Sequence, residues 1–354
     1  MSMSQDRIIT SVAPSRAEFA DRQAAMTRQW AKNAHDHGDA EALFAQRRAA
    51  YLARWTEALR FVPDGSRLLD IGGGNGFAEL FRLLSSRRID YHYLDVDPAA
   101  VEASRNIART CGLDSAQFGH GFNDQLPHPD ASFDFVFSSH CLEHSFDLTA
   151  TFNEVHRVLR PGGSLLMAVP FGWELGLEHP YFFGPNEWLV LLQEAGFEIR
   201  TAQIGKEYPQ HGHDYFVCAR RLDAAPKRRR LDPKSYSKME YVYLPASEAE
   251  LMLQGTWEPC REGVIGIAGA TAAWEPPQDA RIVLPIFQRH DWSGIVEARW
   301  GDSIIQEDLF SWHPFPMPVH IQRGAGRNTL ELRALGGKAC SNAGQIVLMG
   351  LMYR

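Results

Sequence analysis

The chain has 354 residues, of which 45% are apolar and 22% are charged, and its formal net charge is −7 at pH 7. This length exceeds one ordinary hydrophobic core and predicts two domains, and the composition excludes disordered and fibrous proteins. The acidic balance gives no general attraction to nucleic acid or to an anionic membrane, so small or neutral substrates are favoured.

The N-terminal residues lack the apolar core of a signal peptide, and no later stretch approaches the roughly 20 apolar residues of a membrane-spanning helix. Five widely spaced cysteines form no Cys-x-x-Cys pair, which indicates reduced thiols. We therefore expect a cytoplasmic protein without a membrane-inserted segment, and a homo-oligomer remains open.

Residues 1–60 are predicted to form a helical segment that could act as a lid, because large apolar residues recur there at helical spacing. Within residues 61–222, short apolar strands alternate with helices of about 10–15 residues, which is typical of a doubly wound, mostly parallel sheet. The strands are expected at RLLDI (67–71), YHYLDV (91–96), FDFVFSS (133–139), GSLLMAVP (163–170), FEIRTAQIG (197–205) and YFVCARR (215–221).

Local signals refine this α/β domain. Asp97 is expected to cap a helix that starts at Pro98, and the segment PGG (161–163) is expected to end a helix before a strand. The last two expected strands leave no room for a helix between them. They predict a hairpin, which adds one antiparallel strand to the sheet.

Residues 223–240, with DAAPKRRRLDPKS, are interpreted as a solvated linker, and a nucleic-acid patch at KRRR is the alternative. In residues 241–354, short strands separated by Gly, Pro and Asn turns predict an all-β sandwich. The linker leaves the sheet at the edge opposite the carboxyl ends of the parallel strands. Its length still allows the sandwich to reach the substrate side, where we expect it.

The stretch LLDIGGGNGF carries a strand directly into a glycine-rich turn and a helix. Glycine is required where the backbone turns tightly and approaches a ligand closely. The glycines at Gly72, Gly74 and Gly76 follow G-x-G-x-G rather than the G-x-G-x-x-G of dinucleotide-binding turns. Asp95 ends the next strand, where an acid binds ribose hydroxyls. A nicotinamide dinucleotide is the alternative cofactor at this point.

Over about residues 60–222, the sequence resembles the class I S-adenosylmethionine-dependent methyltransferases. The motifs that carry the resemblance follow one another in the family's order: LLDIGGGNG, YLDVDP, LPHPDASFDFVFSSHCLEH, VLRPGGSLLMAVP and FFGPNEWLVLLQEAGFEI. The resemblance implies S-adenosylmethionine as the cofactor. A sulfonium donor carries no phosphates, which agrees with a turn that lacks the third glycine position.

The resemblance also implies roles for single residues. Asp70 would orient the methionine end of the cofactor, the three glycines would line it, and Asp95 would hold the ribose. The family's adenine-binding acid is shifted in this sequence, and we expect Asp124 to take its role while Phe122 packs on the ring. The full set of expected cofactor residues is Asp70, Gly72, Gly74, Gly76, Asp95, Val96, Phe122, Asp124 and Ser139.

Methylation of an alcohol requires a base that removes its proton, which we expect among the loops at the carboxyl edge of the sheet. Those loops are rich in histidine: one has His140, Glu143 and His144, the next has Glu178 and His179, and the hairpin has His211, His213 and Asp214. The catalytic candidates are His144, Glu143, His140, His179 and His213. Packing and solvation are the alternative roles of these histidines.

No metal is expected. The alternative is a divalent-metal half-site at His140, Glu143 and His144, which would share one face if a helix started there. This element is similar to the Glu-x-x-Glu-His of the ubiquinone-pathway and small-RNA 2′-hydroxyl methyltransferases, with His140 in place of the first Glu.

The expected sandwich contains Trp257, Trp274, Trp292, Trp300 and Trp312. These rings are interpreted as core residues or as a face on which sugar rings stack. With a polar, histidine-rich site, they favour O-methylation of a hydroxyl on a sugar or glycan. The alternatives are methylation of another small molecule, including a carboxylate that needs no base, and a non-catalytic glycan-binding protein on the same scaffold.

Overall fold

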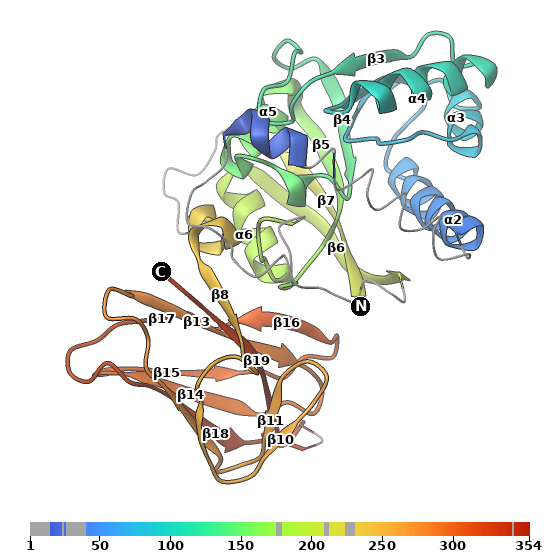
Figure 1. The fold of residues 1–354 in the computed structure, drawn as a ribbon. Coiled ribbons are helices and arrows are strands. Elements are labelled where there is room, and N and C mark those ends of the chain that lie inside the picture. The colour runs from blue at the N-terminus through green and yellow to red at the C-terminus, as the bar shows by residue number, and fades with distance from the viewer. Residues whose placement is uncertain are drawn as a thin grey trace.

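A computed structural model of the chain describes residues 15–22, 25, 40–174, 179–208, 212–223, 231–341 and 343–354. Figure 1 shows an α/β body, coloured from blue to yellow-green, and an all-β body in orange and red. The sheet of the first body extends from Arg67 to Arg221, and the strands of the second extend from Val242 to Tyr353.

The α/β body is built on a seven-stranded sheet with the order β3-β2-β1-β4-β5-β7-β6. Its parallel strands are β1 (Arg67–Ile71), β2 (Asp90–Asp95), β3 (Gln117–His120), β4 (Phe133–Ser139) and β5 (Leu159–Pro170). The hairpin consists of β6 (Phe197–Tyr208) and β7 (Gly212–Arg221), and β7 is antiparallel to both of its neighbours. The predicted sheet, mostly parallel with one antiparallel strand, is confirmed.

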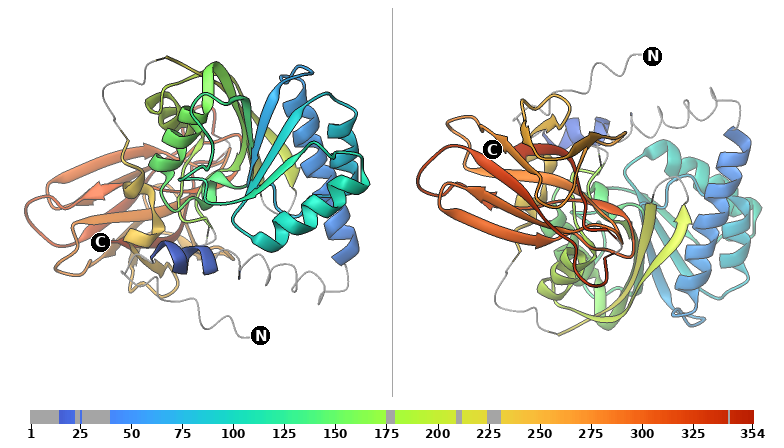
Figure 2. Two further views of the ribbon diagram at one scale, coloured as in Figure 1. Left: turned by 90° about the horizontal axis from the view of Figure 1, so that it is seen from above. Right: turned by 90° about the horizontal axis from the view of Figure 1, so that it is seen from below.

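Helices cover both faces of this sheet, as the two views of Figure 2 show. They are α2 (Ala40–Leu59), α3 (Ala78–Ser85), α4 (Pro98–Thr110), α5 (Leu148–Val158) and α6 (Pro185–Glu194). Trp55 of α2, Leu84 of α3 and Val101 of α4 belong to the buried cluster on one face. Phe152 of α5 and Trp188 of α6 belong to the cluster on the other face. The apolar stripes of the helices therefore seal the sheet on both sides.

Some local features follow the sequence signals and others do not. Asp97 caps α4 as expected, since its Oδ1 accepts a hydrogen bond from the N–H of Ala99 (2.9 Å). The PGG segment does not end a helix: α5 already ends at Val158, and the segment lies inside β5, where Gly162 has a φ of 76°. Strand β3 is not among the expected strands, because its four residues lie at the sheet edge and lack an apolar pattern.

The all-β body contains two antiparallel sheets. One has β10 (Trp257–Pro259), β11 (Val264–Gly266), β19 (Ile346–Tyr353), β13 (Ile282–Arg289) and β16 (Phe315–Pro318), together with β8 (Val242–Pro245) and β17 (Ile321–Gln322). The other has β15 (Ser303–Asp308), β14 (Ile295–Trp300), β18 (Leu330–Gly336), β12 (Thr271–Trp274) and β9 (Met252–Gln254). Phe287 of the first sheet and Leu332 of the second share one buried cluster, so the sheets form a sandwich.

The sandwich docks at the carboxyl edge of the parallel strands, on the expected side. The segment that follows β5 at this edge, residues 171–174 and 179–183, is called the site loop below. Its Trp173 and Phe182 are buried in one cluster with three apolar side chains of the sandwich sheet. The N–H of Trp173 also donates to the carbonyl of Pro316 (2.7 Å). The two bodies therefore share a small core next to the site.

The second half of the expected linker is packed rather than solvated. The N–H of Leu231 donates to Glu194 Oε2 (3.2 Å), at the C-terminal end of α6. Two short 3-10 helices follow, η2 (Pro233–Tyr236) and η3 (Lys238–Glu240). The ring of Tyr236 lies 5.4 Å from that of Phe183, before the start of α6. The chain thus runs back along α6 to the carboxyl edge. The KRRR block lies outside the described residues.

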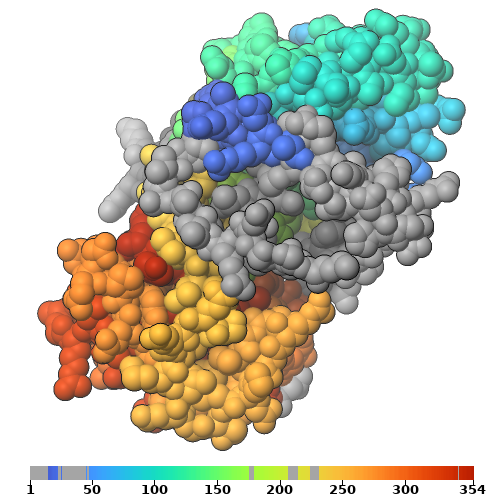
Figure 3. Space-filling view, in the orientation of Figure 1, coloured from blue at the N-terminus to red at the C-terminus, as the bar shows by residue number. Residues whose placement is uncertain are grey.

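The N-terminal segment is helical where it is described. Residues 15–22 begin with a capping box, in which the N–H of Ser15 donates to Glu18 Oε2 (2.8 Å) and the N–H of Glu18 donates to Ser15 Oγ (3.3 Å). Figure 3 shows this helix, in blue, on the surface of the α/β body.

Within the part of the chain that the structure describes, no helix has the length and apolar character needed to cross a membrane.

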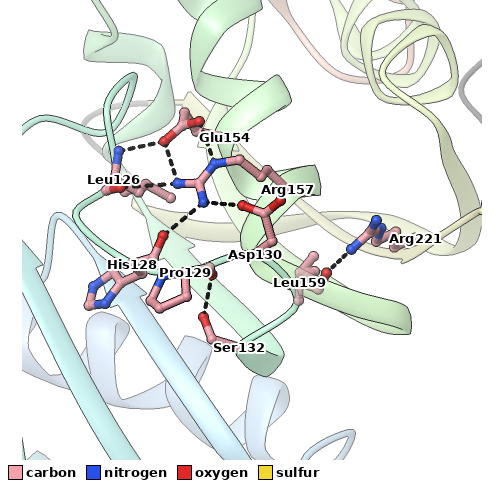
Figure 4. A network of polar contacts seen from close by, with 9 residues as sticks. All are labelled: Leu126, His128, Pro129, Asp130, Ser132, Glu154, Arg157, Leu159 and Arg221. Carbon is pink, nitrogen blue, oxygen red and sulfur yellow. Dashed lines mark hydrogen bonds and ion pairs between the residues drawn. The ribbon is translucent and has the colours of Figure 1, made fainter.

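The loop between β3 and β4 is anchored by Arg157 of α5, as Figure 4 shows. Arg157 Nη1 donates to Asp130 Oδ1 (2.7 Å) and to the carbonyl of His128 (2.8 Å), and Nη2 donates to the carbonyl of Leu126 (3.1 Å). Glu154 accepts from Arg157 Nε (2.7 Å) and from the N–H of Leu126 (2.7 Å). The loop that carries the expected adenine contacts therefore has a fixed position relative to α5.

Candidate active site

The glycine turn has the conformation that its sequence requires. Gly72 and Gly74 have φ angles of 72° and 58°, which other residues rarely adopt. A Cβ on Gly72 would lie 2.2 Å from Cys141 Sγ, whereas a Cβ on Gly74 would meet no atom of the described residues within 4 Å. As far as these residues are concerned, there is room for a ligand beside Gly74. Gly72 is packed against the segment that follows β4.

Gly76 has a packing role that the sequence analysis does not assign to it. A Cβ on Gly76 would lie 2.3 Å from the ring of Phe81 in α3, and the N–H of Gly76 donates to Ser104 Oγ of α4 (2.8 Å). The missing side chain lets both helices approach the turn. The expected contact of Gly76 with a cofactor stays a prediction.

Asp70 and Asp95 lie at the ends of β1 and β2, beside this turn. Asp70 is fully buried; Tyr91 donates its hydroxyl to Oδ2 (2.6 Å), and Oδ1 has no hydrogen-bond partner among the described residues. Asp95 accepts from the N–H of Gly74 (2.9 Å) and of Asp97 (2.8 Å). Burial raises the pKa of Asp70 to about 7 and also raises that of Asp95. A cation bound at Asp70 would restore its ionised form.

Phe122 and Asp124, the expected adenine contacts, are covered by the N-terminal helix. Arg16 Nη1 donates to Asp124 Oδ1 (2.9 Å), and the Arg16 guanidinium lies 5.4 Å from the centroid of the Phe122 ring. Phe19 of the same helix packs edge-on against Phe146, with 5.4 Å between ring centroids. The pKa of Asp124 is raised, because the effect of burial exceeds the opposing effect of the Arg16 charge. This helix therefore closes the adenine side of the site.

His140 is held between two carboxylates. Its φ of 51° is unusual for a residue other than glycine and costs free energy. Its Nε2 lies 2.8 Å from Asp214 Oδ1 on β7, and its Nδ1 lies 3.5 Å from Glu143 Oε1. Arg54 of α2 is 2% exposed and donates to Asp214 Oδ2 (2.7 Å) and to Ser139 Oγ (3.3 Å). One buried ionic network therefore joins α2, β4 and β7.

Ser139 and Val96 are both predicted cofactor contacts. Ser139 is bound to Arg54 as described, and the carbonyl of Val96 lies 3.0 Å from His120 Nε2. Both residues stand at the carboxyl ends of their strands, as the sequence predicts. Their contacts with a cofactor stay predictions.

Glu143, His144 and His179 come together from two loops. Glu143 and His144 belong to η1 (Leu142–His144) and His179 belongs to the site loop. Glu143 is 2% exposed, and among the described residues neither of its carboxylate oxygens has a hydrogen-bond partner. His144 Nε2 lies 4.0 Å from Glu143 Oε1, and the rings of His144 and His179 have centroids 4.6 Å apart. His179 Nδ1 forms an ion pair with Glu174 Oε1.

The Glu174 carboxylate controls the protonation of His179. Burial lowers the pKa of His179, but the hydrogen bond to Glu174 and the charges of Glu143 and Glu174 outweigh it, so the pKa is raised. Burial raises the pKa of Glu174, but its contact with His179 outweighs that effect and the pKa is lowered. With Nδ1 bound to Glu174, the ring presents Nε2 for proton exchange with a substrate.

The ligand atoms of Glu143, His144 and His179 lie within 4.8 Å of one another, a spacing that a divalent ion could bridge. The alternative metal site derived from the sequence consists of His140, Glu143 and His144, with His140 in place of His179. In the structure, His140 lies instead against Asp214. The backbone of His213 belongs to β7, but its side chain, like His211 and Glu178, is outside the described part of the chain.

Three charged residues of the site are absent from the sequence-based candidates: Arg16, Arg54 and Glu174. The two arginines lie in helical segments, where arginine usually points to solvent, and Glu174 lies in a loop without a motif. Nothing local in the sequence marks them: Arg16 and Arg54 act through partners 108 and 160 positions away, and the pairing of Glu174 with His179 depends on how their loop is folded.

Comparisons with known proteins agree with the motifs. Residues 69–167 match the family model of a methyltransferase domain. The chain is 30% identical over 196 residues to the 27-O-demethylrifamycin SV methyltransferase of Amycolatopsis mediterranei (strain S699), which covers 51% of this chain and 71% of that protein. It is 34% identical over 118 residues to the malonyl-[acyl-carrier protein] O-methyltransferase of Halorhodospira halophila (strain DSM 244 / SL1), which covers 33% of this chain and 38% of that protein. A solved S-adenosylmethionine-dependent methyltransferase from Aquifex aeolicus aligns at 20% identity and a TM-score of 0.41, over 47% of this chain and 89% of that chain.

The region matched by the family model begins in β1 and ends in β5, so it contains the glycine turn, Asp95 and the segment from His140 to His144. S-adenosylmethionine is thus the cofactor, and the nicotinamide alternative is set aside. The similarity over most of the Amycolatopsis protein, together with the motif order, shows that the chain belongs to the class I S-adenosylmethionine-dependent methyltransferases, enzymes that transfer a methyl group.

Proposed function

We propose that the protein methylates a hydroxyl oxygen of a sugar or saccharide, with His179 as the general base. The observation that carries this proposal is the Glu174–His179 ion pair, which lies beside His144 and Glu143. Cys141, two residues before Glu143, touches the glycine turn at Gly72. The candidate base is therefore built next to the turn that approaches the cofactor.

The residues at the turn fit the cofactor of the family. The unpartnered Oδ1 of Asp70 suits the ammonium of the methionine end, and Asp95 at the rim of the turn suits the ribose hydroxyls. The open space beside Gly74 admits the cofactor chain. When bound, S-adenosylmethionine supplies an activated methyl group, which passes to the acceptor oxygen as its bond to sulfur breaks.

His179 has the features of a general base. Glu174 binds Nδ1 and fixes the orientation of the ring, so Nε2 can take the proton of the acceptor hydroxyl while the new carbon–oxygen bond forms. The imidazolium that results is stabilised by Glu174 and by the buried charge of Glu143. His140, with carboxylates at both ring nitrogens, is better suited to positioning than to proton transfer.

A saccharide acceptor is supported by the sandwich surface. Trp274 and Trp300 are core residues, whereas Trp312 is 72% exposed and packs edge-on against Phe310. Its segment continues into Phe315, which packs against Phe171 of the site loop with 5.1 Å between ring centroids. The exposed indole in this segment offers the flat apolar surface on which a pyranose ring stacks.

The names of relatives support an oxygen acceptor, although of different kinds. The Amycolatopsis protein is named for methylation at an oxygen, and the Halorhodospira protein is also an O-methyltransferase. Another relative, 30% identical over 123 residues, is the dimethylglycine N-methyltransferase of Parasynechococcus marenigrum (strain WH8102). The acceptor therefore has to be identified by experiment.

The first test offers methyl glycosides, nucleotide sugars and small carboxylic acids together with S-adenosylmethionine labelled in its methyl group. An alkali-stable methyl ether on a sugar supports the proposal. An alkali-labile methyl ester shows that the acceptor is a carboxylate and contradicts it.

The second test replaces the base. His179→Gln should lower kcat about 10²–10⁴-fold and leave the affinity for S-adenosylhomocysteine unchanged, while His290→Gln on the sandwich serves as the control. Because the pKa of His179 is raised and the base must be neutral, kcat/KM should rise with pH through that pKa. A flat profile contradicts the base. Activity that is lost with a chelator and restored by a divalent ion would assign this cluster to a metal instead.

A further inference from the structure

Lys238 binds both arms of the site loop. Its backbone N–H donates to the carbonyl of Pro180 (2.7 Å), and its Nζ donates to the carbonyl of Glu174 (3.0 Å). Only 1% of Lys238 is exposed, which is rare for a lysine and requires polar partners in the interior. Lys238 therefore connects Glu174 with Pro180, the residue that follows His179.

The sandwich fixes the same loop at a second point. Gly172 has a φ of 97°, and a Cβ on it would lie 2.9 Å from the carbonyl oxygen of Pro316. The N–H of Gly172 donates to the carbonyl of Phe183 (2.7 Å), which draws the two arms of the loop together. The neighbouring Trp173 is buried against the sandwich. The loop conformation is thus set by contacts outside the α/β domain.

We propose that Lys238, in the segment that leads into the C-terminal sandwich, is a positioning residue that holds the Glu174–His179 pair in its working place. The inference rests on the proposed function only in that His179 is the base whose position matters. It gives this connecting segment a part in the chemistry of the site.

The charge of Lys238 adds to its hydrogen bonds. The charged groups that act on His179 are Glu174, Glu143 and Lys238, and those that act on Glu174 are His179, Lys238 and His144. The two carboxylates favour the imidazolium, while the ammonium of Lys238 opposes it. Removal of this ammonium should therefore raise the pKa of His179 and reduce the fraction of neutral base at pH 7.

The test requires no knowledge of the acceptor. The full-length protein is titrated by NMR at the Cε1 resonances of its histidines, and the signal of His179 is assigned by its loss in His179→Gln. Lys238→Gln, which keeps a donor and removes the charge, should move the titration of His179 to higher pH. Lys238→Met also removes the donor to the carbonyl of Glu174, so it should titrate at lower pH than Lys238→Gln, because the Glu174–His179 hydrogen bond is loosened. Lys234→Met, at an exposed lysine of η2, is the matched control and should leave it unchanged. The affinity for S-adenosylhomocysteine, measured by calorimetry, should stay within about twofold in these variants, because the cofactor turn is not altered.

The proposal is overturned if folded Lys238→Met and Lys238→Gln titrate alike at His179, because the donor to Glu174 then has no influence on the pair. If Lys238→Met does not fold, Lys238→Leu is compared with Lys238→Gln in the same way. With an acceptor in hand, Lys238→Met should lower kcat roughly tenfold or more at pH 7, since small displacements of a base are costly, and part of the loss should be regained at higher pH. Full activity of His179→Gln would remove the proposed function and leave the NMR result interpretable.

Discussion

The cofactor side and the acceptor side of the active site are built differently. On the cofactor side, Asp70, Asp95 and the glycine turn come from two neighbouring strands. Asp95 is bound by backbone N–H groups of Gly74 and Asp97, and Asp70 by the hydroxyl of Tyr91 on the adjacent strand. On the acceptor side, Arg54 reaches Asp214 across 160 positions of sequence, and Lys238 reaches Glu174 across 64. The first depends on local geometry, and the second depends on the docking of distant elements.

This difference implies that cofactor binding and turnover can be separated by mutation. Contacts within one motif form whenever the sheet forms, whereas the acceptor side also requires α2, the β6–β7 hairpin and the sandwich to be in place. Substitutions on the acceptor side should therefore lower turnover while the cofactor still binds. Substitutions on the cofactor side should weaken cofactor binding and leave the acceptor KM little changed.

The largest effect is expected on the acceptor side from Arg54→Met. It leaves the buried carboxylate of Asp214, 4% exposed, without its arginine partner, so the free energy of unfolding should fall by about 3–5 kcal/mol in urea denaturation. The double variant Arg54→Met/Asp214→Asn should recover part of this loss. If the single variant is as stable as the wild type, the network does not connect the elements as described.

Asp95→Ala should act on the cofactor side alone. If Asp95 binds the ribose as proposed, loss of its carboxylate should weaken binding of S-adenosylhomocysteine by about 1.5–3 kcal/mol, which is roughly 10–100-fold in calorimetry. The acceptor KM should change little. Asp97→Ala is the control, because Asp97 caps α4 instead. Equal effects of the two variants would place the ribose contact elsewhere.

Gly172→Ala tests the contact between the site loop and the sandwich. A side chain at a φ of 97° and 2.9 Å from a carbonyl oxygen should cost about 1–3 kcal/mol of stability and lower turnover, with cofactor affinity kept. Gly269→Ala, at a φ of 87° with no atom within 4 Å of its Cβ, supplies the backbone cost alone. Equal stability and activity of the two variants would show that the contact with Pro316 has no influence on the loop.

The smallest effect is expected from Arg16→Ala. The Arg16 side chain is 38% exposed, so its ion pair with Asp124 should contribute at most about 1 kcal/mol. Cofactor affinity should change less than about fivefold, and the change should diminish at high salt. A larger loss of affinity would mean that the N-terminal helix is an integral part of the adenine pocket.

The sequence alone determined the α/β sheet, its strand types, the cap of α4 and the place of the glycine turn. These features depend on interactions between residues that are close along the chain: the apolar period of a strand, a carboxylate two residues before the N–H that it caps, and glycines where the backbone takes positive φ. The short edge strand β3 and the PGG segment inside β5 escaped this reasoning, since neither has a local pattern that separates it from a loop.

The sequence also predicted that the candidate histidines would lie at one edge, because all loops after parallel strands emerge there. Only the tertiary structure decided their partners. It placed His140 between Asp214 and Glu143, paired His179 with Glu174, and brought a buried lysine from an expected linker to the same loop. The contacts of His140 with Asp214 and of Lys238 with Glu174 join residues 74 and 64 positions apart, and their geometry follows from how whole elements pack, which no local pattern records.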